Sequence, residues 1–135
     1  MIAAIVDDNE MDRYLVRRLL ARHEVVTAVV EAETGVDFLD QLQTGDAHLV
    51  ETTEPTLVFM DVNMPRMDGF ETAERLQDLV EAGATPGSIV VMMFTSSDNP
   101  ADKARADAID IVKGYIVKPM GQQELSDIIT RYSAQ

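Results

Sequence analysis

The apolar stretch Thr56-Leu57-Val58-Phe59-Met60 runs directly into Asp61, and Val62-Asn63-Met64-Pro65-Arg66-Met67-Asp68-Gly69 follows. A short apolar run with β-branched and aromatic residues predicts a buried strand, so we expect Asp61 where that strand gives way to a loop. Open α/β sheets place their binding and catalytic groups at this carboxyl end of the strands. Taken alone, Asp61 could equally be a helix N-cap or a turn residue.

A second acidic position follows the first apolar run of the chain. Residues 2–6 are apolar and lead straight into Asp7 and Asp8. If this strand and the strand before Asp61 are parallel neighbours, the three carboxylates meet at one edge of the sheet. Like charges held that close together raise a pKa or require a cation.

Two further predicted strands also end in reactive side chains. The run 88–94 ends at Thr95, and the run 114–117 ends at Lys118, which precedes Pro119. Thr95 could merely belong to a helix cap, and a lone lysine is more often a solvated surface amine. Their common position after apolar runs favours one site that combines acids, a hydroxyl and an amine.

The remaining residues predict five alternating strand and helix units. We expect a second strand at 25–31, and helices that begin after Asn9, near Val36, near Phe70, at Pro100 and near Leu125. The stretch 46–54 is predicted to be a loop and Thr85-Pro86-Gly87 a turn. Alternating strands and helices indicate a doubly wound α/β fold with a parallel sheet and right-handed crossovers.

Composition limits the class of protein. The 135 residues fit a single domain, 1–135, and we expect no output domain beyond the last helix. The absence of cysteine excludes disulfides and zinc–thiolate sites. A net charge of −13 argues against direct binding to nucleic acid or to an anionic membrane. No apolar run approaches the ~18 residues of a membrane span and no signal peptide is visible, so we expect no membrane insertion and a cytoplasmic location.

The predicted group of residues suits phosphoryl transfer to a carboxylate. Asp61 is the candidate nucleophile, because a carboxylate oxygen can attack phosphorus when the charge of the transferring group is offset. Asp7 and Asp8 would supply oxygen ligands for Mg²⁺, and the Asn63 carbonyl could complete the metal shell. Lys118 would pair with the bound phosphoryl group and the Thr95 hydroxyl would donate a hydrogen bond to it.

The chain resembles the receiver domains of the two-component response regulator family. The resemblance is carried by Val6-Asp7-Asp8-Asn9, by residues 59–69, by Phe94-Thr95-Ser96 and by Tyr115-Ile116-Val117-Lys118-Pro119. These motifs occur in the family's order and span nearly the whole chain. The resemblance implies a flavodoxin-like (βα)5 fold with strand order 2-1-3-4-5.

The resemblance also implies how such a site works. A sensor histidine kinase or a histidine phosphotransfer protein would phosphorylate Asp61. Asp8 and Asp61 would bind Mg²⁺ by their side chains, Asn63 by its backbone carbonyl, and Asp7 directly or through water.

Further implications concern the residues around the phosphoryl group. Thr95 would move toward it, with Ser96 as the alternative hydroxyl, and Tyr115 would then turn inward and reshape a protein-binding face. Ser97 occupies the position at which the family tunes dephosphorylation. The Lys118–Pro119 peptide bond would be cis.

Several alternatives remain open at this stage. A phosphatase of the haloacid dehalogenase type also uses an aspartyl phosphate, but it needs a second Asp two residues after the nucleophile, where this chain has Asn63. An EF-hand is disfavoured because Arg66 stands where the loop needs Gly. A receiver without catalytic function is disfavoured because every reactive position is filled. The chain could be a relay or an effector, a monomer or a phosphorylation-dependent dimer, and its downstream protein target is unknown.

Overall fold

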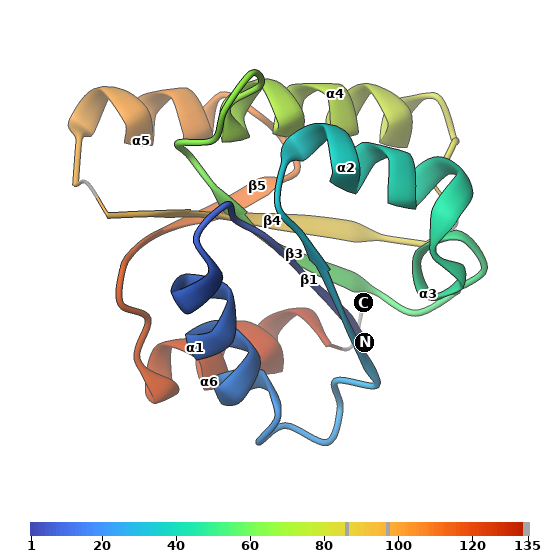
Figure 1. The fold of residues 1–135 in the computed structure, drawn as a ribbon, viewed down its shortest axis with the longest axis horizontal. Helices are drawn as coiled ribbons and strands as arrows, with labels where there is room; N and C mark the ends of the chain where they lie inside the picture. The colour runs from blue at the N-terminus through green and yellow to red at the C-terminus, as the bar shows by residue number, and fades with distance from the viewer. Residues whose placement is uncertain (86, 97, 134–135) are drawn as a thin grey trace.

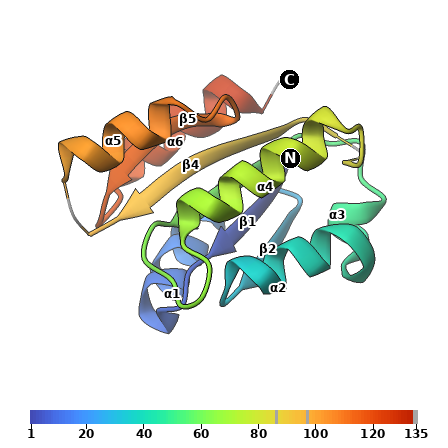
Figure 2. The same cartoon turned by 90° about the horizontal axis from the view of Figure 1, so that it is seen from above.

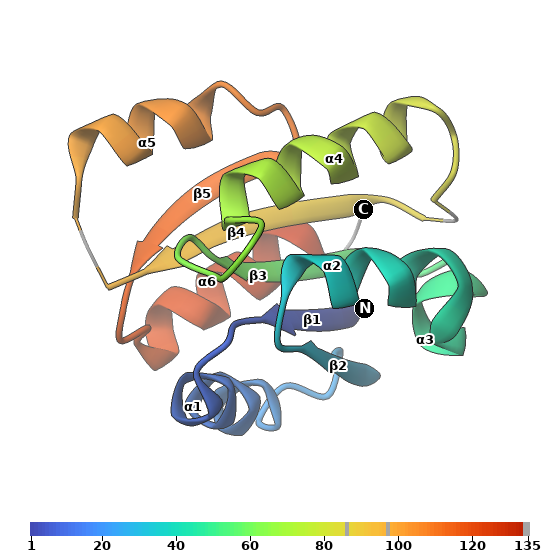
Figure 3. The ribbon, with the colours of Figure 1, turned by 45° about the horizontal axis from the view of Figure 1, so that its top comes forward.

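A computed structural model describes residues 1–85, 87–96 and 98–133, and a five-stranded parallel sheet forms its centre (Figure 1). The strands lie in the order β2-β1-β3-β4-β5, which Figure 3 shows from one side of the sheet. The predicted doubly wound fold and strand order are therefore confirmed. The strand bounds are β1 Ile2–Val6, β2 Ala28–Ala32, β3 Thr56–Asp61, β4 Ile89–Thr95 and β5 Val112–Val117.

Helices cover both faces of the sheet. Figures 1 and 2 show α1 and α6 on one face and α2, α4 and α5 on the other. A π-helical turn, η1, continues α2, and a short helix, α3, follows it. The helix bounds are α1 Glu10–Leu20, α2 Gly35–Asp40, η1 Gln41–Gly45, α3 Ala47–Val50, α4 Gly69–Glu81, α5 Pro100–Asp107 and α6 Gln122–Tyr132.

The three central strands are buried along their whole length, which explains their continuous apolar sequences. Successive side chains of a strand point to opposite faces, so each strand feeds two cores. In β3, Phe59 belongs to the core that also contains Val16 of α1 and Leu125 of α6. The adjacent Val58 belongs to the other core, with Phe70 of α4. The sheet is thus held from both sides, and its carboxyl ends are fixed in position.

Helix starts follow the capping signals in the sequence. The side chain of Asn9 accepts a hydrogen bond from the Asp12 backbone N–H, and Asn99 accepts one from Ala101. Pro100 is the first residue of α5, where its missing N–H costs nothing. The predicted starts of these two helices are therefore confirmed.

Two predictions in the first half of the chain differ from the structure. The strand expected at 25–31 lies at Ala28–Ala32, because the Val26 N–H still donates to the His23 carbonyl in a turn. The loop expected over 46–54 contains α3, which buries Leu49. A helix of 4 residues is too short to give a periodic pattern of apolar residues in the sequence. Pro86 of the predicted turn and Ser97 lie outside the described residues.

Gly69 allows α4 to begin directly against the end of β3. Its backbone N–H donates to the Val62 carbonyl at 2.9 Å. A Cβ atom added at Gly69 would overlap the backbone carbonyl oxygen of Asp61. Any larger residue must therefore push α4 away from the strand end that carries Asp61.

We expect Gly69→Ala to lower the free energy of unfolding by on the order of 2 kcal/mol, because the new methyl group collides with rigid backbone. Urea denaturation measures this change. Gly45→Ala is the matched control, because its added Cβ would come no closer than 3.7 Å to the atoms around it, and its effect should stay within about 0.5 kcal/mol. Equal stability of the two variants would contradict the tight approach at Gly69.

Candidate functional site

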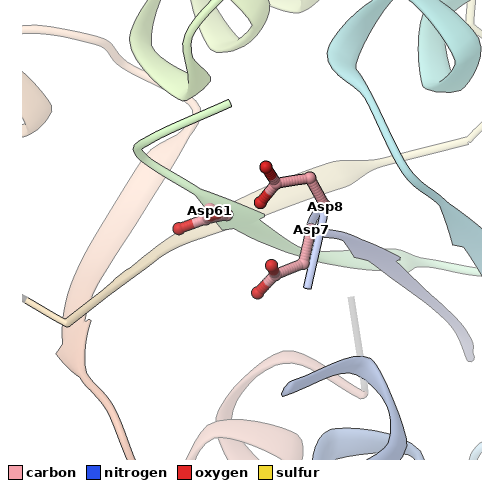
Figure 4. Close-up of side chains that lie close together, drawn as sticks. All are labelled: Asp7, Asp8 and Asp61. Carbon is pink, nitrogen blue, oxygen red and sulfur yellow. The ribbon is translucent and has the colours of Figure 1, made fainter. Parts of the chain in front are cut away.

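Three carboxylates meet at the carboxyl edge of the sheet (Figure 4). Asp7 and Asp8 follow β1, and Asp61 is the last residue of β3. The two strands are parallel neighbours, with Val6 opposite Met60, so their ends coincide. One carboxylate oxygen from each residue lies within 4.8 Å of the others. Asp7 and Asp61 are buried, whereas Asp8 is exposed, so the cluster opens to solvent on the Asp8 side.

The Lys118 ammonium faces this cluster from the end of β5. Its Nζ donates to Asp7 Oδ2 at 2.8 Å, to Asp12 Oδ2 at 2.8 Å and to Asp61 Oδ1 at 3.4 Å. The Lys118 backbone N–H donates to the Thr95 carbonyl at 2.7 Å, and the Lys118–Pro119 peptide bond is cis. A partly buried cation that follows β5 thus offsets part of the negative charge.

Asp7 is held on both sides. Its Oδ1 accepts a hydrogen bond from the Asn9 backbone N–H at 2.9 Å, while its Oδ2 accepts from Lys118. The Arg13 guanidinium donates to the Asp7 backbone carbonyl at 2.7 Å. These contacts fix the Asp7 carboxylate beside Asp61.

The electrostatics of the site perturb two pKa values. Burial, and secondly the charge of Asp7, raise the pKa of Asp61 to about 7, although Lys118 opposes the shift. Burial alone would lower the pKa of Lys118, but the hydrogen bonds that its ammonium donates to Asp12 and Asp7, together with the charge of Asp61, raise this pKa above its ordinary value. Lys118 therefore remains an ammonium at neutral pH.

The donor set fits a hard divalent cation. Carboxylate oxygens are the ligands that Mg²⁺, Ca²⁺ and Mn²⁺ prefer, and a cation would relieve the repulsion among Asp7, Asp8 and Asp61. Asn63 follows two residues after Asp61 in the loop between β3 and α4. Its backbone carbonyl is a further candidate ligand.

Thr95 and Tyr115 lie on the neighbouring strands β4 and β5. Thr95 is fully buried at the end of β4, whereas Ser96 is exposed. Burial and the charge of Asp102 raise the pKa of the Tyr115 phenol, and a hydrogen bond with the Thr95 side chain opposes this. The two side chains are therefore in contact.

Asp12 is a further residue of the site that the sequence did not predict. Its carboxylate contacts Lys118 as closely as Asp7 does. In the sequence, Asp12 is an ordinary acidic residue in the first turn of a helix, where such residues are common. No signal in the chain linked it to a lysine more than a hundred residues later.

The fold and the site together define a class of protein: a doubly wound α/β domain with an acidic, lysine-paired site at the sheet edge. A family model described as the response regulator receiver domain matches residues 3–130. The chain therefore belongs to the receiver domain family of two-component response regulators.

Individual proteins agree with this assignment. The chemotaxis protein CheY of Halobacterium salinarum is 31% identical over 126 residues, which cover 93% of this chain and 91% of that protein. A structure of CheY4 from Vibrio cholerae has a TM-score of 0.74 at 24% identity and covers 97% of both chains. A Mn²⁺-bound structure of the response regulator Rcp1 has a TM-score of 0.71 at 21% identity and covers 96% of this chain and 89% of that one.

Some relatives are longer than this chain, which spans about half the length of several that it matches. Among the helices of residues 1–85, 87–96 and 98–133, none is long and apolar enough to cross a membrane.

The raised pKa of Asp61 predicts a pH-dependent stability in the metal-free protein. Folding raises this pKa, so the folded chain keeps a proton that the unfolded chain has lost at intermediate pH. The resulting stabilisation is fully present below the ordinary pKa of about 4 and is lost as the pH rises through about 7.

Asp61→Asn removes this titration. In the presence of a chelator, we expect its stability relative to the native chain to rise by on the order of 2 kcal/mol between pH 5 and pH 8. Urea denaturation at several pH values measures the difference. Asp78→Asn, an exposed change of equal charge on α4, should show no such trend. If the difference in unfolding free energy between Asp61→Asn and the native chain does not change with pH, the raised pKa of Asp61 is contradicted.

Proposed function

We propose that this domain accepts a phosphoryl group on Asp61 from the phosphohistidine of a sensor histidine kinase or a histidine phosphotransfer protein. The observation that carries the proposal is the position of Asp61, buried at the end of β3 between two acidic residues and the Lys118 ammonium. Membership of the receiver domain family supports the same role.

The proposed reaction uses the residues in separate roles. An Asp61 carboxylate oxygen forms a bond to phosphorus while the bond from phosphorus to the donor imidazole nitrogen breaks, and the imidazole leaves. Lys118 donates hydrogen bonds to the phosphoryl oxygens and offsets their charge. The Thr95 hydroxyl donates to another of these oxygens. The product is an acyl phosphate, which adds negative charge at this edge of the sheet.

Mg²⁺ is the proposed metal. Asp8 and Asp61 would hold it by their carboxylates, Asn63 by its carbonyl, and Asp7 directly or through water. When bound, Mg²⁺ would offset the negative charge of the transferring phosphoryl group. The cluster of three carboxylates supports a divalent cation, and the Mn²⁺ in the structure of Rcp1, which shares the fold, is a hard cation of the same charge.

The proposed output is a change in a protein-binding face formed by α5, β5 and α6. Thr95 ends β4 beside β5, and Tyr115 lies on β5 in contact with it. A Thr95 side chain that turns toward the phosphoryl group leaves room for Tyr115 to move inward. This links the charge on Asp61 to a surface about two strands away, where a downstream protein target would bind.

The domain is proposed to be a switch rather than a phosphatase. Hydrolysis in the haloacid dehalogenase manner needs an acid two residues after the nucleophile, and the amide of Asn63 cannot supply a proton in that way. Steady turnover of a generic phosphate ester by the native chain would refute this part of the proposal.

We expect incubation with acetyl phosphate and Mg²⁺ to add one phosphoryl group to the native chain. Asp61→Asn should abolish the addition, because an amide cannot form the acyl phosphate. Intact-protein mass spectrometry measures the product. Asp78→Asn should be labelled like the native chain. Labelling of Asp61→Asn to the native extent would identify another acceptor and refute the proposal.

Mg²⁺ binding tests the metal ligands without any reaction. We expect titration calorimetry to detect binding by the native chain and to show an affinity lower by about tenfold or more for Asp8→Asn, which loses a charged oxygen ligand. Asp8 is exposed, so this change should leave the fold intact. Asp78→Asn again provides a control of equal charge. Unchanged affinity of Asp8→Asn would exclude Asp8 as a ligand.

A further inference from the structure

The Lys118 ammonium is shared unequally among three carboxylates. Its contacts with Asp7 and Asp12 are both 2.8 Å, whereas the contact with Asp61 is 3.4 Å. An ammonium group has three hydrogens to donate. The two closest acceptors are therefore residues other than the one that would carry a phosphoryl group.

Asp12 belongs to a different part of the site from the other acids. It lies in the first turn of α1, and its backbone N–H donates to the Asn9 side chain at 2.9 Å. Its side chain is 30% exposed, and it is not a member of the group Asp7, Asp8 and Asp61 whose oxygens approach one another. Asp12 thus holds Lys118 without being placed to share a cation with the cluster.

Asp12 also borders the open side of the lysine. A cavity of about 570 Å³ between α1 and the segment after β5 is lined by Asp12 and Lys118 together with Leu15, Phe94 and Met120. The Phe94 ring lies under the ammonium, with Nζ 5.1 Å from its centroid. This cavity leaves space beside the ammonium on the side that faces α1. On that side, the contact with the Asp12 carboxylate is therefore what holds the ammonium in place.

We propose that Asp12 is a positioning residue that holds the Lys118 ammonium away from Asp61 and so weakens the site for a phosphoryl group. This inference rests on the proposed function. To donate fully to a phosphoryl oxygen on Asp61, the ammonium must lengthen or give up one of its short contacts. Asp7 remains beside the phosphoryl group, so the contact with Asp12 is the one that opposes the move.

The first test measures the affinity for fluoroberyllate, a phosphoryl analogue that binds to a carboxylate oxygen, in saturating Mg²⁺. Asp12→Asn keeps the shape of the side chain and removes its charge. We expect it to bind fluoroberyllate more tightly by on the order of fivefold, the size of effect that a partly exposed ion pair supports. Glu10→Gln removes the same charge from the same exposed helix turn and should stay within about twofold of the native chain.

The second test shows whether the effect passes through Lys118. In the protein without fluoroberyllate, the ¹⁵N NMR signal of the Lys118 ammonium should shift in Asp12→Asn and stay unchanged in Glu10→Gln. Backbone amide spectra confirm that both variants are folded. Tighter fluoroberyllate binding without a shift of this signal would indicate direct repulsion by Asp12 and would overturn the proposal, as would unchanged binding.

The two hypotheses fail in different ways. A native chain that binds no fluoroberyllate and accepts no phosphoryl group would refute the proposed function. If the native chain does both, and Asp12→Asn and Glu10→Gln bind fluoroberyllate with the same affinity, only the role of Asp12 is refuted.

Discussion

The repulsion among Asp7, Asp8 and Asp61 is the constraint on which the site depends. Parallel pairing of β1 with β3 places the ends of both strands side by side, which brings Asp61, the last residue of β3, close to Asp7 and Asp8 after β1. Burial of Asp7 and Asp61 removes water that would otherwise screen these two carboxylates. The folded chain therefore carries an unfavourable charge arrangement at this edge, and a cation or a proton on Asp61 relieves it. Lys118 supplies one permanent positive charge, which is too little for three carboxylates.

The rest of the fold keeps this arrangement in place. The central strands are apolar on both faces, and two layers of helices hold them in register. Backbone hydrogen bonds then tie together the strand ends that carry the functional groups: Val62 donates to the Phe94 carbonyl, and Lys118 donates to the Thr95 carbonyl. Gly69 lets α4 start against Asp61 itself. The carboxylates, the hydroxyl and the ammonium thus belong to one rigid edge, although they come from four different strands.

The sequence predicted the parts of this molecule that depend on burial. Strands that are buried on both faces need continuous apolar runs, so their number, order along the chain and acidic ends could be read directly. The helix starts after Asn9 and at Pro100 followed from local chemistry. The start of β2 was misplaced because Val25 and Val26 look like strand residues but belong to a turn. Helix α3 is one turn long and gives no periodicity. The role of Asp12 could not be predicted because it depends on a tertiary contact with Lys118. The sequence around neither residue indicates this contact.

Lys118 connects the acidic cluster to two separate surfaces of the domain. Its side chain reaches Asp12 on α1, whereas its backbone is bonded to Thr95, whose side chain contacts Tyr115 on β5. A phosphoryl group on Asp61, as proposed, would attract the ammonium. Because the ammonium already contacts three acidic side chains, a closer approach to Asp61 would lengthen its contact with one of the other two. Such a displacement would alter the contact with α1 and would also act beside the end of β4. In a chain with a net charge of −13, the Lys118 ammonium would in this way link the proposed phosphoacceptor, Asp61, to both surfaces.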